Sequence, residues 1–215
     1  HKCDLLFVPG GSFSCSFKPI VTMSRNMLPF EWVEARRYGF NLITLRIIIL
    51  RWLQSKSFRS ANGVIFLTNY AKDQVTKITG ELPGKKSIIP HGLNQRFLIE
   101  PKEQFEISKY SNENPYQLLY VSIIDQYKHQ WYVVDAVAKL RDMGYPVVLN
   151  LVGPAYPAAL KRLSKKINKL DKKKEYIKYH GSIPYKDLHN IYKESHLGIF
   201  ASSCENMPNI LIETM

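Results

Sequence analysis

Cysteine is scarce in this sequence of 215 residues, and the motifs that usually mark metal or nicotinamide chemistry are missing. The three cysteines, Cys3, Cys15 and Cys204, stand far apart without a C-x-x-C pair, which argues against a disulfide framework and against a zinc site. The six histidines lack H-E-x-x-H spacing, so we expect no metal centre. The G-x-G-x-x-G fingerprint of nicotinamide-dependent dehydrogenases is also absent. The cysteine pattern favours the reduced environment of the cytosol.

Acidic residues are few relative to basic ones. The chain has 30 Lys and Arg against 18 Asp and Glu, a net charge of +12, which implies an anionic partner: a nucleic acid, an anionic membrane surface or a phosphorylated small molecule. The charge alone does not choose among them. The most basic stretch, residues 161–178, carries inward leucines at helical spacing, so we interpret it as the solvated face of an amphipathic helix, with a surface that binds nucleic-acid or membrane phosphates as the alternative.

Long hydrophobic runs are absent as well. The most apolar stretch is Leu42–Leu53, which is too short and, with Arg46 and Arg51, too charged to cross a bilayer. We interpret it as a mostly buried helix, with a helix lying in the membrane interface as the alternative. The chain begins without Met and ends within an expected helix, so we expect it to be a fragment of a longer protein.

Short apolar runs alternate with helical patterns along most of the chain, which predicts parallel sheets covered by helices on both faces. Residues 98–114 are rich in Glu, Lys, Ser and Asn, so we interpret them as a linker between a domain at 1–97 and a domain at 115–215. The expected strands are residues 4–8, 19–23, 63–68, 87–89, 118–123, 147–152, 176–179 and 197–200. Besides Leu42–Leu53, the expected helices are residues 128–143, 155–170 and 184–193, one starting at Tyr70 and one starting at Pro208.

The last sixteen residues carry the clearest chemistry. Glu205 and Glu213 stand eight positions apart, a little over two helical turns, and Pro208 starts a helix between them. The start of that helix presents free N–H groups at the carboxyl edge of the sheet, where open parallel sheets bind ligands. A diphosphate at the helix start, with a carboxylate for hydroxyl groups on each side, suits a nucleotide-sugar.

This segment resembles the E-x7-E signature of the family-four retaining glycosyltransferases, which have the GT-B fold of two Rossmann-like domains. Three further stretches resemble the same group in order and spacing: the end of its first domain, the opening of its donor domain and a donor-domain strand and turn. They are Ile89–Phe97, Leu118–Lys128 and Tyr179–Pro184. A fourth, Asn26–Glu31, is similar to a first-domain loop of some bacterial members. The resemblance implies an α/β chain with two Rossmann-like domains, both incomplete.

The resemblance also implies roles for single residues. Lys128 would neutralise the donor diphosphate as it leaves, Glu205 would lie near the transferred sugar, and Glu213 would accept hydrogen bonds from the nucleotide ribose. Lys128 and Glu205 are thereby the catalytic candidates. The further donor-binding candidates are Ser122, Gly153, Gly181, Asn206, Met207, Pro208 and Asn209, and the acceptor-side candidates are Gly10, Gly11, Asn26 and His91.

The sequence departs from the group's pattern in several places, one of which is His91, where the group more commonly has Asn. The usual Gly-Arg pair after the first donor-domain strand is replaced by Ser122 and Ile123, which leaves Lys128 as the cation for the diphosphate. Where the group often has E-G-F-G-L-P, this sequence has E-N-M-P-N at residues 205–209, and this difference could alter the contacts to the donor sugar. Ile123 therefore keeps an alternative open: a non-catalytic homologue that serves as a nucleotide-sugar-binding or partner-binding subunit.

The expected activity is that of a retaining hexosyltransferase-type enzyme. It would move a sugar from a nucleoside diphosphate to a surface glycan, such as lipopolysaccharide, or to a lipid-linked precursor. We expect no cofactor and no metal, because nothing resembles the Asp-x-Asp pair that holds a divalent ion against donor phosphates. The expected location is the cytoplasm, with peripheral binding to the anionic inner face of the plasma membrane as an option. Nucleic-acid binding, suggested only by charge, is the remaining alternative and is not expected.

Overall fold

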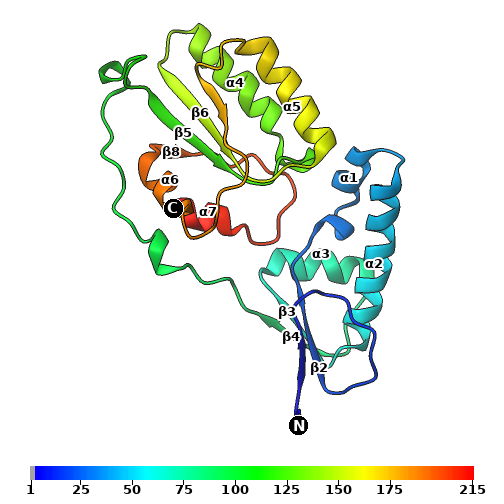
Figure 1. Ribbon diagram of the computed structural model, residues 1–215. Helices are drawn as coiled ribbons and strands as arrows, with labels where there is room; N and C mark the ends of the chain where they lie inside the picture. The colour runs from blue at the N-terminus through cyan, green and yellow to red at the C-terminus, as the bar shows by residue number, and fades with distance from the viewer. Residues whose placement is uncertain (1–2) are drawn as a thin grey trace. The chain divides into compact units, whose positions relative to one another are not determined.

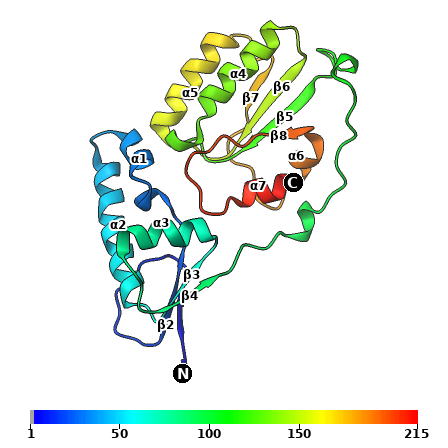
Figure 2. The same cartoon turned by 180° about the vertical axis from the view of Figure 1, so that it is seen from behind.

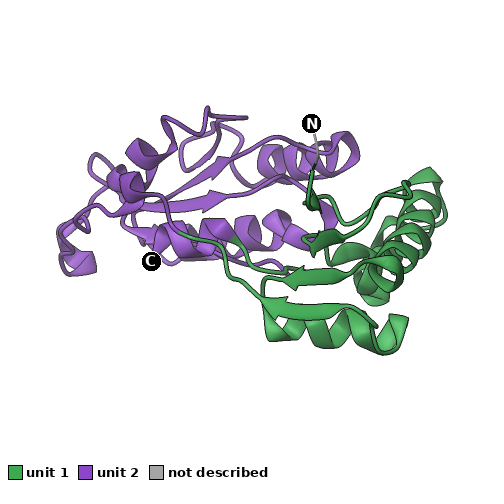
Figure 3. Cartoon of the chain, turned by 90° about the horizontal axis from the view of Figure 1, so that it is seen from below, with its two compact units in different colours: residues 1–92, 204–208 green, residues 93–203, 209–215 purple. Residues whose placement is uncertain are grey.

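The computed structural model describes residues 3–215 and divides the chain into two compact units (Figure 3). Unit 1 comprises His1–Gly92 and Cys204–Pro208, and unit 2 comprises Leu93–Ser203 and Asn209–Met215. Each unit contains a four-stranded parallel sheet, in the order β1-β2-β3-β4 in unit 1 and β7-β6-β5-β8 in unit 2. The expected α/β class with two Rossmann-like sheets is therefore confirmed (Figures 1 and 2).

Unit 1 builds its sheet from short strands joined by helical crossovers, as parallel strands require. Two crossover helices, α2 and α3, lead from β2 to β3 and from β3 to β4. Asn41 caps α2, because its side chain accepts from the N–H groups of Ile43 and Thr44 at 2.8 and 3.2 Å. Thr68 caps α3 in the same way, accepting from Ala71 N at 3.1 Å. The elements are β1 (Leu6–Val8), β2 (Ile20–Ser24), α1 (Trp32–Ala35), α2 (Leu42–Ser60), β3 (Gly63–Phe66), α3 (Asn69–Thr79) and β4 (Lys85–Ile88).

The helix expected at Leu42–Leu53 is present as the longer α2, but the expectation that it is mostly buried is wrong. Ile48, in its middle, is 44% exposed, and Trp52 is 63% exposed. The aromatic core of unit 1 lies at the other end of the helix, where Phe58 packs against Phe30 and Phe66 with ring centroids 6.0 and 6.5 Å apart. No helix within residues 3–215 is both long and apolar enough to cross a membrane.

Unit 2 packs its central strands on both faces, which explains their nearly continuous apolar sequence. One face, with Leu118 and Leu149, contacts α4 and α5, and the other, with Leu119 and Val152, contacts α6 (Figure 1). The elements are β5 (Tyr116–Val121), α4 (Gln130–Asp142), β6 (Val147–Val152), α5 (Pro157–Leu170), β7 (Ile177–Tyr179), α6 (Leu188–Glu194), β8 (Leu197–Gly198) and α7 (Asn209–Thr214).

The four helices of unit 2 all begin later than their sequence patterns predict: α4 at Gln130, α5 at Pro157, α6 at Leu188 and α7 at Asn209. Residues 184–187 form a turn closed by Asp187 N and Pro184 O at 2.9 Å, so α6 starts at Leu188 and not at Pro184. Lys128 ends a short 3-10 turn, Gln126–Lys128, and His129 adopts a left-handed conformation with φ 57° before α4 begins. The left-handed residue separates Lys128 from the helix that was expected to contain it.

A buried carboxylate shapes the connection from α5 to β7. Asp171 follows the last residue of α5 and accepts hydrogen bonds from three backbone N–H groups, those of Glu175, Tyr176 and Ile177, at 2.9, 2.9 and 2.8 Å. The connection therefore depends on one side chain to satisfy donors that no other strand or helix pairs.

We expect Asp171→Ala to lower the free energy of unfolding by about 3 kcal/mol, because it leaves buried donors without a partner. The matched control is Asp135→Ala, which removes a partly exposed ion pair to Lys166 at 2.7 Å and should cost under about 1 kcal/mol. Urea unfolding followed by circular dichroism measures both. Equal losses in the two variants would contradict the role given to Asp171.

Candidate functional site

A cavity of about 350 Å³ opens at the carboxyl edge of the unit 2 sheet, where open parallel sheets bind ligands. Its walls come from the ends of β5 and β6, the turn after β7, and the helices α6 and α7. Four of the predicted donor-binding residues line it together: Ser122, Gly153, Asn209 and Glu213. The full lining is Val121, Ser122, Ile123, Val152, Gly153, Pro154, Ser182, Ile183, Tyr185, Leu188, Asn209, Ile210 and Glu213.

Gly153 closes one wall of this cavity and leaves no room for a side chain. Its φ is +140°, and a Cβ on it would lie 2.1 Å from the carbonyl oxygen of Ser122. Its N–H donates to Gly181 O at 2.8 Å, and its carbonyl accepts from the hydroxyl of Tyr179 at 2.9 Å. The ends of β5, β6 and β7 are thereby tied together. Gly181 supplies a turn and a carbonyl for this arrangement but does not line the cavity.

Gln130 supports the neighbouring wall from inside the unit. It is fully buried, and its amide donates to the Ser122 hydroxyl at 2.8 Å and to the Ile123 carbonyl at 2.9 Å. These bonds hold the loop that contains Ser122 and Ile123, the two residues that replace the family's usual Gly-Arg pair. Sequence reasoning did not find Gln130; its signal was a polar residue on the otherwise apolar inner side of α4.

Glu213 is buried and is held by two tyrosine hydroxyls. Tyr185 donates to its Oε1 at 3.1 Å and Tyr192 to its Oε2 at 3.3 Å. Burial first, and then the negative charge of Glu213, raise the pKa of Tyr185 and of Tyr192, so both hydroxyls keep their protons at neutral pH. Neither tyrosine was among the predicted site residues. Each lies far from Glu213 in sequence, so no local pattern pointed to the contact.

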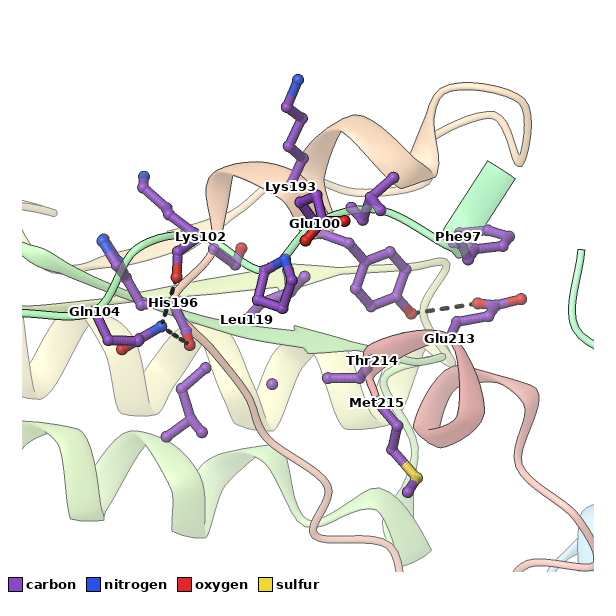
Figure 4. Close-up of a pocket in the computed structure, with 16 residues that line it drawn as sticks. Phe97, Glu100, Lys102, Gln104, Leu119, Lys193, His196, Glu213, Thr214 and Met215 are labelled. Carbon is purple, nitrogen blue, oxygen red and sulfur yellow. Dashed lines mark hydrogen bonds between the residues drawn. The ribbon is translucent and has the colours of Figure 1, made fainter. Parts of the chain in front are cut away.

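A second, smaller cavity of about 130 Å³ is also lined by Glu213 (Figure 4). Tyr192 is another of its lining residues. The linker after residue 98 forms one wall, because Lys102 Nζ donates to Glu194 O at 3.0 Å and Gln104 Nε2 donates to His196 O at 2.8 Å. Glu213 therefore lines two cavities of the same unit.

Lys128 is buried in unit 2 and does not line either cavity. Its carbonyl accepts from the Tyr120 hydroxyl at 2.6 Å, and its Nζ lies 5.0 Å from the centroid of the Tyr127 ring. The Tyr127 carbonyl in turn accepts from Ser203 N at 2.9 Å. The lysine is thus enclosed, unlike a solvated lysine at the start of a helix.

The residues before Pro208 belong to unit 1 and not to the cavity. Asn206 Nδ2 donates to Ser24 O at 2.8 Å, at the end of β2, and the Thr68 hydroxyl donates to Asn206 Oδ1 at 3.4 Å. The N–H of His91 points to Met207 Sδ at 3.2 Å. The structure therefore brings one predicted donor-binding residue, Met207, next to the acceptor-side candidate His91. Glu205 and Pro208 are half-buried in the same segment.

The acceptor-side candidates have local structural roles. Asn26 Oδ1 accepts from Leu28 N at 3.1 Å and so forms a turn ahead of α1. Gly10 and Gly11 follow β1. Gly11 has a φ of +77°, a backbone conformation that residues with a side chain rarely adopt. Burial first, and then the charge of Arg25, lower the pKa of His91, so its ring is neutral at neutral pH.

Comparison with known proteins supports what the geometry indicates. A family model described as "Glycosyl transferases group 1" matches residues 101–215, more than half of the chain. The chain belongs to this family. The comparison of this group 1 chain with curated proteins gave no significant match.

Solved structures share the fold of the group 1 chain at low sequence identity. Anabaena HepE, crystallised with UDP and glucose, is 20% identical with a TM-score of 0.64, over 91% of this chain and 50% of that one. Sucrose-phosphate synthase from Thermosynechococcus elongatus is 17% identical with a TM-score of 0.68, over 91% and 47%. Trehalose-6-phosphate synthase from Burkholderia multivorans is 13% identical with a TM-score of 0.64, over 92% and 49%. The chain spans about half the length of these proteins, and the likeness confirms the GT-B architecture.

Gly153→Ala should lower the free energy of unfolding by about 3 kcal/mol or more, since the new methyl group would strike the Ser122 carbonyl and the backbone would have to shift. Gly181→Ala is the matched control. Its φ is +69°, but no atom lies within 4 Å of the added carbon, so only backbone strain of about 1 kcal/mol is expected. Thermal unfolding of both variants tests this. A Gly153→Ala protein as stable as Gly181→Ala would show that the strand ends are not closely packed.

Proposed function

We propose that this protein transfers a sugar from a nucleoside diphosphate to an acceptor hydroxyl, with retention of configuration, and that the larger cavity of unit 2 holds the nucleotide. The observation that carries the proposal is the carboxylate of Glu213, buried at the wall of this cavity between two tyrosine hydroxyls. The volume of the cavity, about 350 Å³, is in the range of small-molecule sites.

The chemistry of Glu213 suits a ribose. An ionised carboxylate has about four acceptor positions on its two oxygens. Tyr185 and Tyr192 occupy one on each oxygen, which leaves one on each for a pair of adjacent hydroxyl groups. Two apolar side chains that also line the cavity, Ile123 and Ile183, suit the flat face of a base.

Lys128 has the charge needed at the diphosphate. In the transfer, the bond between the anomeric carbon and the phosphate oxygen breaks as the acceptor oxygen bonds to that carbon, and negative charge grows on the leaving diphosphate. An ammonium group in a buried setting stabilises such charge more strongly than one in water. The proposal assigns this role to Lys128 and places Glu205 near the transferred sugar; it involves no cofactor and no divalent ion.

The proposed acceptor is a surface glycan or a lipid-linked precursor, reached from the cytoplasmic side of the plasma membrane. The net charge of +12 supports an anionic membrane surface at this location. The proposed donor is a hexose nucleotide, and the UDP and glucose bound by HepE make UDP the first probe to use.

A second candidate function is nucleotide-sugar binding without turnover. Ile123 lines the cavity at the place where the family resemblance expects an arginine, so the site has one cation fewer for the diphosphate. Binding of donor without release of the nucleoside diphosphate would favour this candidate.

Glu213→Gln should weaken UDP binding by about 5- to 30-fold, because an amide offers one acceptor oxygen where the carboxylate offers two. The weakening should be smaller when the ligand is 2′-deoxy-UDP, which lacks one of the two hydroxyl groups. Calorimetric titration of both proteins with both nucleotides gives the coupling between carboxylate and hydroxyl. Equal losses for UDP and the deoxy analogue would place Glu213 away from the ribose.

Lys128→Ala should weaken UDP binding by about 1–3 kcal/mol, the range for a charge-assisted contact, while uridine binding stays unchanged. Lys139→Ala, an exposed lysine on α4, is the matched control and should bind UDP like the parent protein. Circular dichroism establishes that both variants are folded. Unchanged UDP affinity in a folded Lys128→Ala variant would remove Lys128 from the site.

A further inference from the structure

A short 3-10 turn of unit 2, Gln95–Phe97, contacts the two tyrosines that hold Glu213. The ring centroid of Phe97 lies 5.5 Å from that of Tyr185 and 5.6 Å from that of Tyr192. Phe97 is buried, and it lines the smaller cavity together with Glu213 (Figure 4). The turn therefore packs directly against the side chains that donate hydrogen bonds to this carboxylate.

Arg96, which precedes Phe97 in this turn, places its cation over the ring of Tyr185. The guanidinium carbon lies 5.1 Å from the ring centroid, within the range of a cation–π contact. Asn94 fixes this position, because its Oδ1 accepts from the backbone N and from the Nε of Arg96, both at 3.1 Å. The Tyr185 hydroxyl donates to Glu213 at 3.1 Å. A chain of contacts thus leads from Asn94 to the carboxylate.

The charge of Arg96 acts on the Tyr185 hydroxyl although Arg96 lines neither of the two cavities that Glu213 lines. Burial first, and then the charge of Glu213, raise the pKa of Tyr185, whereas the charge of Arg96 lowers it. A cation near a phenol polarises its O–H bond and strengthens the hydrogen bond that the hydroxyl donates. Arg96 therefore affects both the orientation of Tyr185 and the strength of its bond to Glu213.

We infer that Arg96 is a positioning residue for the nucleotide: it orients Tyr185, and Tyr185 holds the Glu213 carboxylate ready for the ribose hydroxyls. This role rests on the nucleotide site proposed above and adds to it a residue that lies outside the cavity. A carboxylate that is already held in place binds a pair of hydroxyl groups more tightly than one that is ordered only on binding.

A direct role at the diphosphate is the competing assignment for Arg96, because Ile123 stands where the family resemblance expects an arginine. The contacts favour the indirect role. The guanidinium is bonded through Nε to Asn94 and lies over the Tyr185 ring, outside the cavity that Ile123 lines. The two assignments differ in their ligand dependence. A positioning residue acts at the ribose and affects uridine and UDP alike, whereas a diphosphate ligand affects UDP alone.

The test is calorimetric titration of purified Arg96→Gln with UDP and with uridine. We expect both ligands to bind about two- to fivefold more weakly than to the parent protein, the range for a lost cation–π contact. Arg96→Lys keeps a cation for the ring and should restore part of the affinity. Arg141→Gln is the matched control, since the Arg141 guanidinium lies 5.3 Å from the centroid of Tyr176, a similar pair whose residues line neither cavity. It should bind both ligands like the parent protein.

Tyr185→Phe tests whether Arg96 acts through the tyrosine hydroxyl. This variant keeps the ring but loses the donor to Glu213, so it should itself weaken UDP binding. Arg96→Gln added to Tyr185→Phe should weaken binding no further, because the contact through which it acts is already lost. A full additional loss in the double variant would overturn the inference. A loss confined to UDP, or an Arg96→Gln protein that binds like Arg141→Gln, would also overturn it.

A measurement without ligand separates this inference from the nucleotide proposal. Urea unfolding gives the losses of stability in Arg96→Gln, in Glu213→Ala and in the double variant. If Arg96 acts on Glu213 through Tyr185, the double variant should lose less than the sum of the two single losses. Such coupling in a parent protein that does not bind UDP would defeat the nucleotide site alone. Additive losses would overturn the role of Arg96, whether or not UDP binds.

Discussion

The close contact between Gly153 and the Ser122 carbonyl is the constraint on which the candidate site depends. Because Gly153 has no side chain, the end of β6 can lie close to the end of β5. Ser122 N then donates to Val152 O at 2.8 Å, and Gly153 N donates to Gly181 O at 2.8 Å. Three strand ends thereby form one rigid rim. The cavity opens along this rim, and Glu213 and Tyr185 also line it.

The most predictable strand was β6, because its apolar run is buried on both faces and ends at Gly153 and Pro154. It covers the expected residues 147–152 without a shift. The largely exposed β4, in contrast, begins at Lys85, two residues before its expected start. The helix starts were less predictable, since a left-handed His129 and a hydrogen-bonded turn after Pro184 depend on tertiary packing. The hydrophobic sequence predicted the position of α2 but not which of its sides is buried. Sequence spacing shows which residues share a face of the helix, and it does not show what packs against that face.

The candidate site was predictable only in part, for a related reason. Spacing joined Glu205 and Glu213 into one signature, yet the structure anchors the signature at two separate places. Asn206 is held by the backbone of Ser24 in unit 1, whereas Glu213 is held by Tyr185 and Tyr192 in unit 2. The partners of these residues lie between 21 and 182 positions away in sequence. Gln130, likewise, acts through the loop it supports and has no motif of its own.

The burial pattern of α2, in which Ile48 and Trp52 are exposed, has a thermodynamic consequence for unit 1. The helix contributes Ser, Thr and Gln side chains to the interior, where most helices contribute Leu and Ile. Exposure of apolar surface raises the heat capacity on unfolding, and exposure of polar surface lowers it. Residue for residue, α2 therefore adds less to the heat capacity of unfolding than α4 and α5 of unit 2, which bury valine, leucine and isoleucine.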